Sequence, residues 1–252
     1  GAIIAAPTAS LPEQIGGSRN WDYRYSWLRD SSFTMDVLCR TGKVDQAARY
    51  LSWLVRRCKA TNGRPRTLYG VSPSSSLKET VLDHLIGYRG SRPVRTGNGA
   101  ARHLQLDVFG EVILGIETLH RQGGEVSDEA WSLVESFAAT VCDNWRRKDR
   151  GVWEVRGSEQ HFVYSKMMCW AALDRAVTLA QALGRNGDSV RWQQTAGEIR
   201  EEVMCRGWSA GKQAFVQRYD SESLDASNLI IPFLGFLPPG DPRLLSTVRA
   251  IA

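Results

Sequence analysis

The sequence predicts an all-α fold, because helical periodicity recurs along most of its 252 residues and strand signals are few. Apolar residues repeat every three or four positions in 104–119, 131–145 and 163–180. Short turns separate these segments, so the pattern predicts antiparallel helical hairpins. With 42% hydrophobic residues, the chain can bury a sizeable core.

Residues that begin or end helices bound the other predicted segments. Ser127 is a favourable N-cap before two acidic residues, and Asp241 before Pro242 marks another helix start. Gly184 is a favourable glycine at a helix end. Further helices are predicted at 31–40, 44–58, 190–204, 226–237 and 242–252. The best strand signals are short pieces at 3–5 and 214–217.

The composition is that of a globular protein and excludes a membrane-spanning one. The longest apolar stretches, such as 229–237, are far shorter than the roughly 20 residues that a membrane helix needs. Gly1–Ala6 lacks the basic residues of a secretion signal, and Gly1 is not an initiator methionine. We therefore interpret the sequence as a fragment cut at both ends, and we expect the protein in the cytoplasm.

The five cysteines predict neither disulfides nor a zinc site. They stand far apart, include no CxxC pair and are odd in number. We expect buried, free thiols.

Basic residues concentrate between positions 56 and 102. This stretch holds ten lysines and arginines against Glu79 and Asp83, while the whole chain carries a net charge of +5. Such a stretch can bind phosphate or nucleic acid. Because only Tyr69 and Tyr88 lie among these charges, we favour a solvated surface that lends a few arginines to a polar pocket.

The segment 21–30 combines four aromatic residues with two arginines and two aspartates, just before a predicted helix. Sugars stack their C–H faces on aromatic rings and bind polar side chains through their hydroxyls, so this mixture favours a saccharide pocket. In the alternative interpretation, Tyr25 and Trp27 belong to the core and Arg29 and Asp30 form a capping salt bridge.

A second polar segment, 151–157, places Glu154 beside Trp153 in a glycine-bounded loop between two helices. A carboxyl group against an apolar ring loses solvation, which raises its pKa and keeps it protonated. Glu154 is therefore a candidate general acid. The alternative is a solvent-facing glutamate paired with Arg156.

Four ordered blocks of the chain, which include both segments, resemble the bacterial glucoamylases and trehalases of glycoside hydrolase family 15. They are Ala5–Asp30 with its RNWDYRYSWLRD run, Leu82–Ala100 with GYRGSRPVR, Leu104–Glu111 with LQLD, and Gly151–Ala176 with GVWEVRG and ALDRA. Because the blocks span nearly the whole chain in order, the resemblance is specific.

The resemblance implies roles for individual residues. It assigns Glu154 as the general acid. It assigns sugar-binding side chains to Tyr23, Trp27, Arg29, Asp30, Arg92 and Trp153. Among these, Arg29 and Asp30 match the pair that binds the hydroxyl groups of the nonreducing-end glucose. Fungal glucoamylases carry an arginine four residues before the aspartate that matches Asp225. This chain has Ser221 at that position, so the resemblance does not imply that it binds sugar beyond the first subsite as the fungal enzymes do.

The fold implied by the resemblance is an (α/α)6 barrel of about six helical hairpins. Residues 1–252 would be one partial catalytic domain, roughly the first two-thirds of that barrel. The family's N-terminal β-sandwich and its general base, a glutamate late in the barrel, would lie outside the chain. Inverting hydrolysis needs two carboxyl groups about 6.5–9.5 Å apart around a water, so the fragment alone is expected to be inactive.

The predicted function is an exo-acting, inverting α-glucoside hydrolase that releases glucose from the nonreducing ends of an α-1,4 or α-1,6 glucan or oligosaccharide. A trehalase of the same family is the alternative. Two other classes stay open: a noncatalytic saccharide-binding helical domain, and nucleic-acid binding through residues 56–102. We expect an α-glucan, an oligosaccharide or trehalose as the partner, and neither nucleic acid nor a membrane. No metal or organic cofactor is expected, and the oligomeric state is left open.

Overall fold

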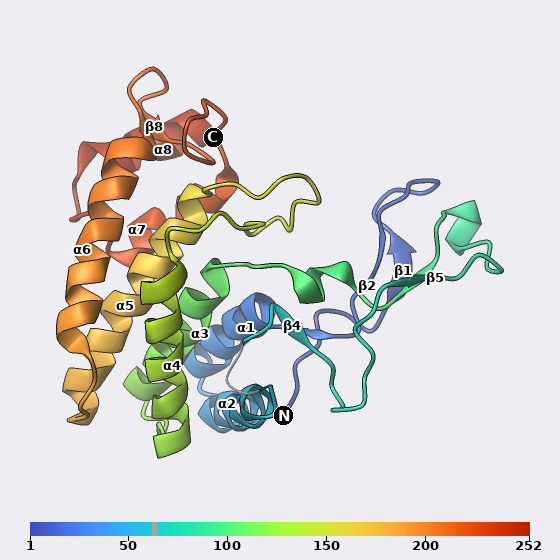
Figure 1. The fold of residues 1–252 in the computed structure, drawn as a ribbon, viewed down its shortest axis with the longest axis horizontal. Coiled ribbons are helices and arrows are strands. Elements are labelled where there is room, and N and C mark those ends of the chain that lie inside the picture. The colour runs from blue at the N-terminus through green and yellow to red at the C-terminus, as the bar shows by residue number, and fades with distance from the viewer. Residues whose placement is uncertain (62–64) are drawn as a thin grey trace. The chain divides into compact units, whose positions relative to one another are not determined.

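The computed structural model describes residues 1–61 and 65–252, and the chain divides into two compact units. The first comprises residues 1–103 and 118–126, and the second comprises residues 104–117 and 127–252 (Figure 1). Arg64, part of the basic stretch, lies outside the described residues.

The first unit joins a pair of helices to short antiparallel hairpins. Helices α1 (Leu28–Arg40) and α2 (Val44–Lys59) follow one another and pack together. Three two-stranded sheets are formed by β1 (Ala9–Pro12) with β2 (Asn20–Asp22), β3 (Ser26–Trp27) with β4 (Leu68–Tyr69), and β5 (Thr80–Val81) with β6 (Arg95–Thr96). Two 3-10 turns, η1 (Tyr88–Gly90) and η2 (Gly99–Arg102), flank β6 along the chain.

The second unit is built on long helices. Its elements are α3 (Asp107–Arg121, whose last residues belong to the first unit), α4 (Asp128–Asn144), α5 (Val163–Leu183), α6 (Ser189–Arg206), β7 (Trp208–Ser209), β8 (Ala214–Phe215), η3 (Ala226–Ile230), α7 (Ile231–Leu234) and α8 (Pro242–Ile251). Helix α5 packs against both α4 and α6 (Figure 1). Most of its residues are buried, so it forms the core of this unit.

The predominantly helical fold is confirmed, and so are several helix boundaries. Ser127 Oγ accepts a hydrogen bond from the Ala130 N–H, and the Asp241 carboxylate accepts one from the Arg243 N–H. Gly184 ends α5 in the left-handed conformation, with φ of 60°. Among the described residues, no helix is both long and apolar enough to cross a bilayer.

The five cysteines are all free, as expected, but they are not all buried. Cys205 is exposed near the end of α6, and Cys142 is partly exposed. Helical periodicity places a residue on a face, but the packing of neighbouring elements decides whether that face is covered.

Asp22 ties the β1–β2 hairpin to the chain that follows β6. Its buried carboxylate accepts hydrogen bonds from Arg24 Nε at 2.9 Å and from the Gly97 N–H at 3.0 Å. Gly97 has φ of +74°, and a Cβ there would lie 1.9 Å from the Lys78 carbonyl oxygen. The contact therefore requires both the carboxylate and the glycine.

We expect Asp22→Asn to destabilise the fold at neutral pH and much less in acid. Burial alone would raise the pKa of Asp22, but hydrogen bonds from Arg24 and Gly97 outweigh it and hold the pKa below its usual value. Such a carboxylate stabilises the fold above the unfolded pKa of about 3.9, and the stabilisation is lost as pH falls through the lower folded pKa. Urea unfolding of the full-length protein should show a loss of about 1–2 kcal/mol at pH 7 that shrinks toward pH 3. An equal loss from Asp45→Asn, at an exposed site in α2, would contradict this assignment.

Candidate active site

Three of the four aromatic residues of the segment 21–30 form one cluster in the first unit. The ring centroids of Tyr23 and Trp27 lie 5.9 Å apart, and those of Tyr25 and Trp27 lie 6.4 Å apart. Trp27 is only 4% exposed and packs with Leu68 and Ala100, whereas Tyr23 is partly exposed. Tyr25 and Trp27 are thus core residues, as the alternative interpretation holds, and Tyr23 is the accessible ring of the cluster.

Arg29 and Asp30 lie in the first turn of α1, which begins three residues earlier than the periodicity predicted. The helix starts at Leu28 because this side chain is fully buried and its N–H donates to the Thr67 carbonyl at 3.0 Å. Arg29 is 7% exposed, while Asp30 is exposed. The two side chains are therefore carried by a helix, which holds them more rigidly than a loop would.

Arg92 lies in the chain between η1 and β6, and its side chain is exposed. The Arg92–Pro93 peptide bond is cis. Asn20 Nδ2 donates to the Pro93 carbonyl at 3.2 Å, which attaches this turn to β2. The turn and the aromatic segment are thus parts of one unit.

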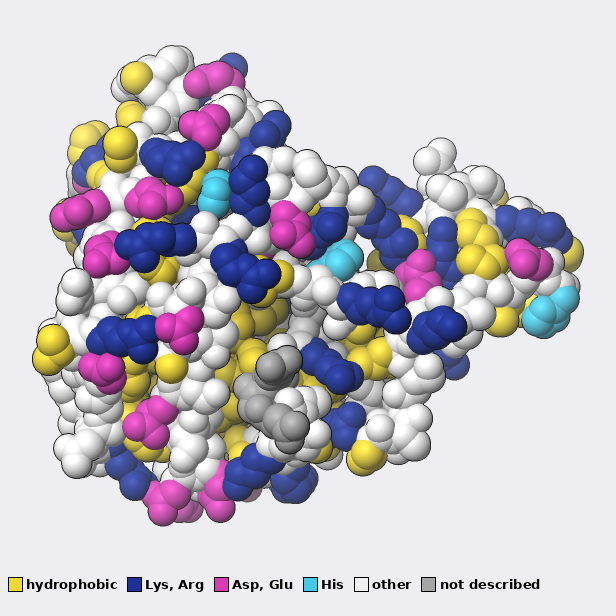
Figure 2. Space-filling model, in the orientation of Figure 1, with side chains coloured by type: hydrophobic (Ala, Val, Ile, Leu, Met, Phe, Trp, Pro, Cys, Tyr) yellow, Lys and Arg dark blue, Asp and Glu magenta, His cyan; other side chains and the backbone are white. Residues whose placement is uncertain are grey.

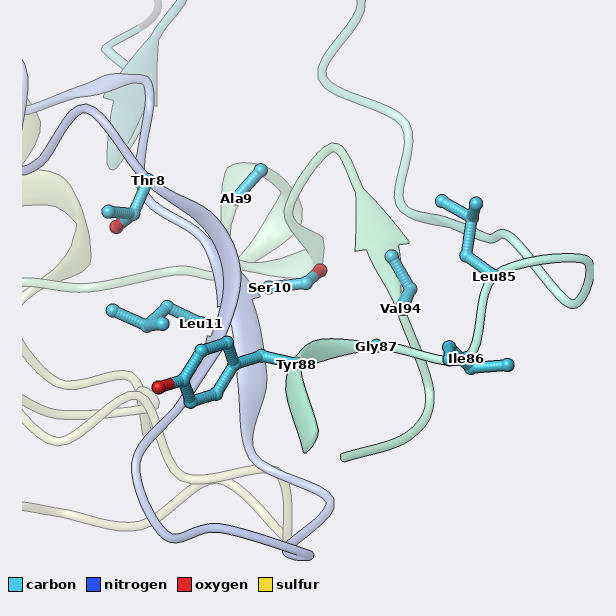
Figure 3. A pocket seen from close by; sticks show the side chains of 9 residues that line it. All are labelled: Thr8, Ala9, Ser10, Leu11, Leu85, Ile86, Gly87, Tyr88 and Val94. Carbon is cyan, nitrogen blue, oxygen red and sulfur yellow. The ribbon is translucent and has the colours of Figure 1, made fainter. Parts of the chain in front are cut away.

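The hollow at the hairpins of the first unit is apolar and holds none of the predicted sugar-binding residues. It encloses about 380 Å³ and is lined by Thr8, Ala9, Ser10, Leu11, Leu85, Ile86, Gly87, Tyr88 and Val94 (Figure 3). A second hollow of about 270 Å³ includes Arg92. Neither contains an aromatic ring beside a carboxylate, the pairing that the proposed chemistry requires.

In the second unit, Trp153 and Glu154 lie on the loop between α4 and α5. The Trp153 side chain is 60% exposed, yet its indole N–H donates to both carboxylate oxygens of Asp225, at 3.0 and 2.9 Å. Asp225 is 7% exposed and also accepts from Gln217 Nε2 at 2.7 Å and from the Ser227 N–H at 2.8 Å. An exposed indole is therefore held in one orientation by a buried carboxylate.

Glu154 is partly buried and adopts a backbone conformation that is rare for a residue with a side chain. Its φ is 54°, in the left-handed region, and its N–H donates to the Gly151 carbonyl at 3.1 Å. Such conformations cost about 1–3 kcal/mol and persist only where the surroundings impose them. The loop thus presents Glu154 in an enforced position, which is typical of functional sites.

Asp225 and Gln217 are site residues that sequence reasoning did not identify. The resemblance to family 15 marks Asp225 only as a matched position, although the D-x-S pattern before a turn predicts a capping carboxylate. Its contact with Trp153 joins positions 72 residues apart, and no local signal encodes such a pair. Ser221, where fungal glucoamylases carry arginine, accepts a hydrogen bond from the Ser223 N–H at 3.1 Å.

On the helices of the second unit, Lys and Arg side chains lie next to Asp and Glu side chains (Figure 2). Arg146 binds Glu198 at 2.7 Å, which connects the chain after α4 to α6. In the first unit, Arg95 pairs with Glu79 at 3.5 Å and lies 4.6 Å from the centre of the Trp21 ring. Arginines of the basic stretch thus stack on aromatic rings and form ion pairs within the fold.

Residues 1–61 and 65–252 contain no group of three or more His, Cys, Asp or Glu side chains positioned to hold a metal ion.

Comparison with known proteins decides the family. The model of the glycosyl hydrolases family 15 matches residues 1–252. The chain belongs to this family. The chain is 40% identical over 251 residues to a trehalase of Thermoplasma volcanium and 42% identical over 255 residues to a trehalase of Mycolicibacterium smegmatis. Both alignments cover all of this chain but only 40% and 38% of those relatives, so the family 15 chain spans about two-fifths of their length.

A solved structure supports the fold. A bacterial glucoamylase complexed with acarbose superposes with a TM-score of 0.67 over 91% of this chain and 33% of that chain, at 17% identity. At this identity the likeness concerns the fold alone. The fold expected from the resemblance is thereby confirmed.

Proposed function

We propose that the full-length protein carrying this chain is an inverting trehalase. The supporting observation is that relatives 40–42% identical along the whole chain are trehalases. The sequence had placed α-glucans ahead of trehalose as the substrate, and these relatives favour trehalose. Trehalose presents a terminal α-glucose to the same subsite, so the roles expected of Tyr23, Arg29 and Asp30 are unchanged. Trp27 is buried in the core beside Tyr23 and is not proposed to contact the sugar.

In the proposed mechanism, Glu154 protonates the oxygen that joins the two glucose units. Water then attacks the opposite face of the reacting sugar, activated by a carboxylate from the remainder of the protein. Trp153 supplies a flat apolar surface beside the acid, and Asp225 holds this surface in place. Protonation of the departing glucose is needed because an unassisted sugar alkoxide is a poor leaving group.

The test is to follow product anomers by proton NMR during the first turnovers of the full-length protein. Both bonds of trehalose at the bridging oxygen are α, so inversion at one carbon yields one β-glucose and one α-glucose per molecule cleaved. Retention would yield α-glucose only. An initial β to α ratio near one supports the proposal, and α-glucose alone contradicts inversion.

Substrate choice is tested by initial rates on trehalose, maltose, isomaltose and maltoheptaose. The proposal expects trehalose to be hydrolysed fastest. A preference for maltoheptaose would support the glucoamylase alternative, and saccharide binding without turnover would support the noncatalytic one. Inactivity without binding on all four would reject the α-glucoside assignment.

A further inference from the structure

The loop that carries Trp153 and Glu154 is closed at its neck by a buried aspartate. Asp149 and Gln160 exchange two backbone hydrogen bonds of 2.9 Å each, so the ten residues between them project as one loop between α4 and α5 (Figure 1). The Asp149 side chain is fully buried. A charged residue type at such a position is unusual and calls for a physical explanation.

The Asp149 carboxylate joins the loop neck to two other parts of the second unit. Its Oδ2 accepts from the Leu106 N–H, just before α3, at 3.0 Å, and from Ser165 Oγ, in the first turn of α5, at 2.8 Å. The next residue, Arg150, donates its N–H to the Leu104 carbonyl at 3.0 Å. The neck is therefore attached to the segment before α3 and to α5 together.

The chain that enters the loop is held by the residue after Ser165. Lys166 is fully buried, and its ammonium donates to the Arg147 carbonyl at 2.5 Å and to the Trp145 carbonyl. These carbonyls follow the C-terminal end of α4, where the helix dipole favours a positive charge. Two consecutive residues of α5 thus hold the loop neck and the end of α4.

We propose that Asp149, supported by Ser165 and Lys166, is a positioning residue that sets the orientation of Glu154. The proposal rests on the assignment of Glu154 as the general acid. Glu154 has φ of 54°, and Gly151 has φ of 65° with no room for a Cβ beside the Phe162 ring. A loop with two left-handed residues is kept in one conformation only if its ends are fixed, and Asp149 fixes both ends.

The ionisation of Asp149 makes asparagine a suitable conservative replacement. Burial and the nearby Asp107 carboxylate raise the pKa of Asp149 to about 7, against the opposing hydrogen bonds from Leu106 and Ser165. Oδ2 accepts both of these bonds, and Oδ1 has no hydrogen-bond partner among the described residues. The amide oxygen of Asp149→Asn can accept both of these bonds, so this replacement keeps them and changes only the group at Oδ1.

The kinetic test compares two substrates of the full-length protein. Hydrolysis of the preferred α-glucoside needs the acid, whereas α-glucosyl fluoride has a leaving group that needs little protonation. We expect Asp149→Ala to lower kcat on the glucoside by about 10–100-fold and on the fluoride by less than about 3-fold. Asp149→Asn should restore most of the glucoside rate. Equal losses on both substrates, or no loss, would overturn the positioning role.

Two controls separate this proposal from the function on which it rests. Thr247→Ala removes a buried hydroxyl on α8 that accepts a hydrogen bond from the Phe215 N–H in the same unit, and it should lower stability without changing the rate ratio. Glu154→Gln should show the same substrate dependence as Asp149→Ala. If Glu154→Gln lowers both rates equally, the assignment of Glu154 as the acid fails. If Glu154→Gln shows the substrate dependence and Asp149→Ala does not, only the positioning role of Asp149 fails.

Hydrogen exchange supplies a readout that does not depend on activity. Asp149→Ala and the milder Ser165→Ala should speed exchange of the Val155 and Gln160 amides by at least about 10-fold relative to Thr247→Ala. These amides donate to Arg150 and Asp149 carbonyls within the loop and its neck. Unchanged exchange at these amides would overturn the proposal even if no substrate is cleaved.

Discussion

Glu154→Gln is expected to lower kcat on trehalose by about 10²–10⁴-fold, the range over which a general acid contributes. Glutamine keeps the size of the side chain and its place in the loop but has no acidic proton to give to the departing glucose. The measurement is the initial rate of glucose release by the full-length variant, with circular dichroism to establish that it is folded. The loss should be much smaller on α-glucosyl fluoride.

Glu159→Gln is the matched control for this prediction. Glu159 lies on the same loop and forms an ion pair with Arg150 at 3.6 Å, so its replacement changes the same charge on the same segment. It should retain a rate within about 3-fold of the native protein, because partly exposed ion pairs contribute little. Equal losses from the two variants would mean that loop charge, and not proton donation, carries the effect.

The second large effect is expected from Asp30→Ala, which should lower kcat/KM on trehalose by about 10²-fold. An aspartate that binds two sugar hydroxyls contributes about 1.5 kcal/mol or more for each charge-assisted hydrogen bond, and each 1.4 kcal/mol is tenfold. Asp30 is exposed in the first turn of α1, so its removal leaves the packing of Leu28 and Arg29 in place. Steady-state kinetics on trehalose measure the loss.

Asp45→Ala is the control, because Asp45 is an exposed aspartate in the first turn of the next helix. It should leave kcat/KM within about 2-fold of the native value, as exposed charges away from a site contribute little. Near-native kinetics for Asp30→Ala would remove Asp30 from the sugar-binding subsite. A loss confined to thermal stability would have the same consequence.

Local features of the helices were predictable to within a few residues. The periodic segments at 131–145 and 163–180 became α4 (Asp128–Asn144) and α5 (Val163–Leu183), with Ser127 and Gly184 at the expected ends. Caps and periodicity act through hydrogen bonds and side chains only a few residues apart, so the sequence displays them directly. The start of α1 was missed because it depends on the burial of Leu28 and its bond to Thr67, across 39 positions.

The candidate site was predictable as residue types but not as an arrangement. The sequence identified Trp153 and Glu154 from their chemistry and their resemblance to family 15. It did not identify Asp225 as the partner of the indole, nor the buried Asp149 at the neck of the loop. Both carboxylates accept hydrogen bonds from residues on other elements. Contacts between positions so far apart in the sequence produce no periodic or local pattern that a sequence analysis could detect.

The sequence by itself determined the helical fold class, the family and the segments that carry the proposed chemistry, because these depend on periodicity, capping and residue type along the chain. Only the tertiary structure decided that Trp27 belongs to the core, that Trp153 is held by Asp225, and that Glu154 has a left-handed conformation in a loop closed by Asp149. These outcomes depend on which distant groups exclude water and satisfy each other's hydrogen bonds. That is a property of packing between elements.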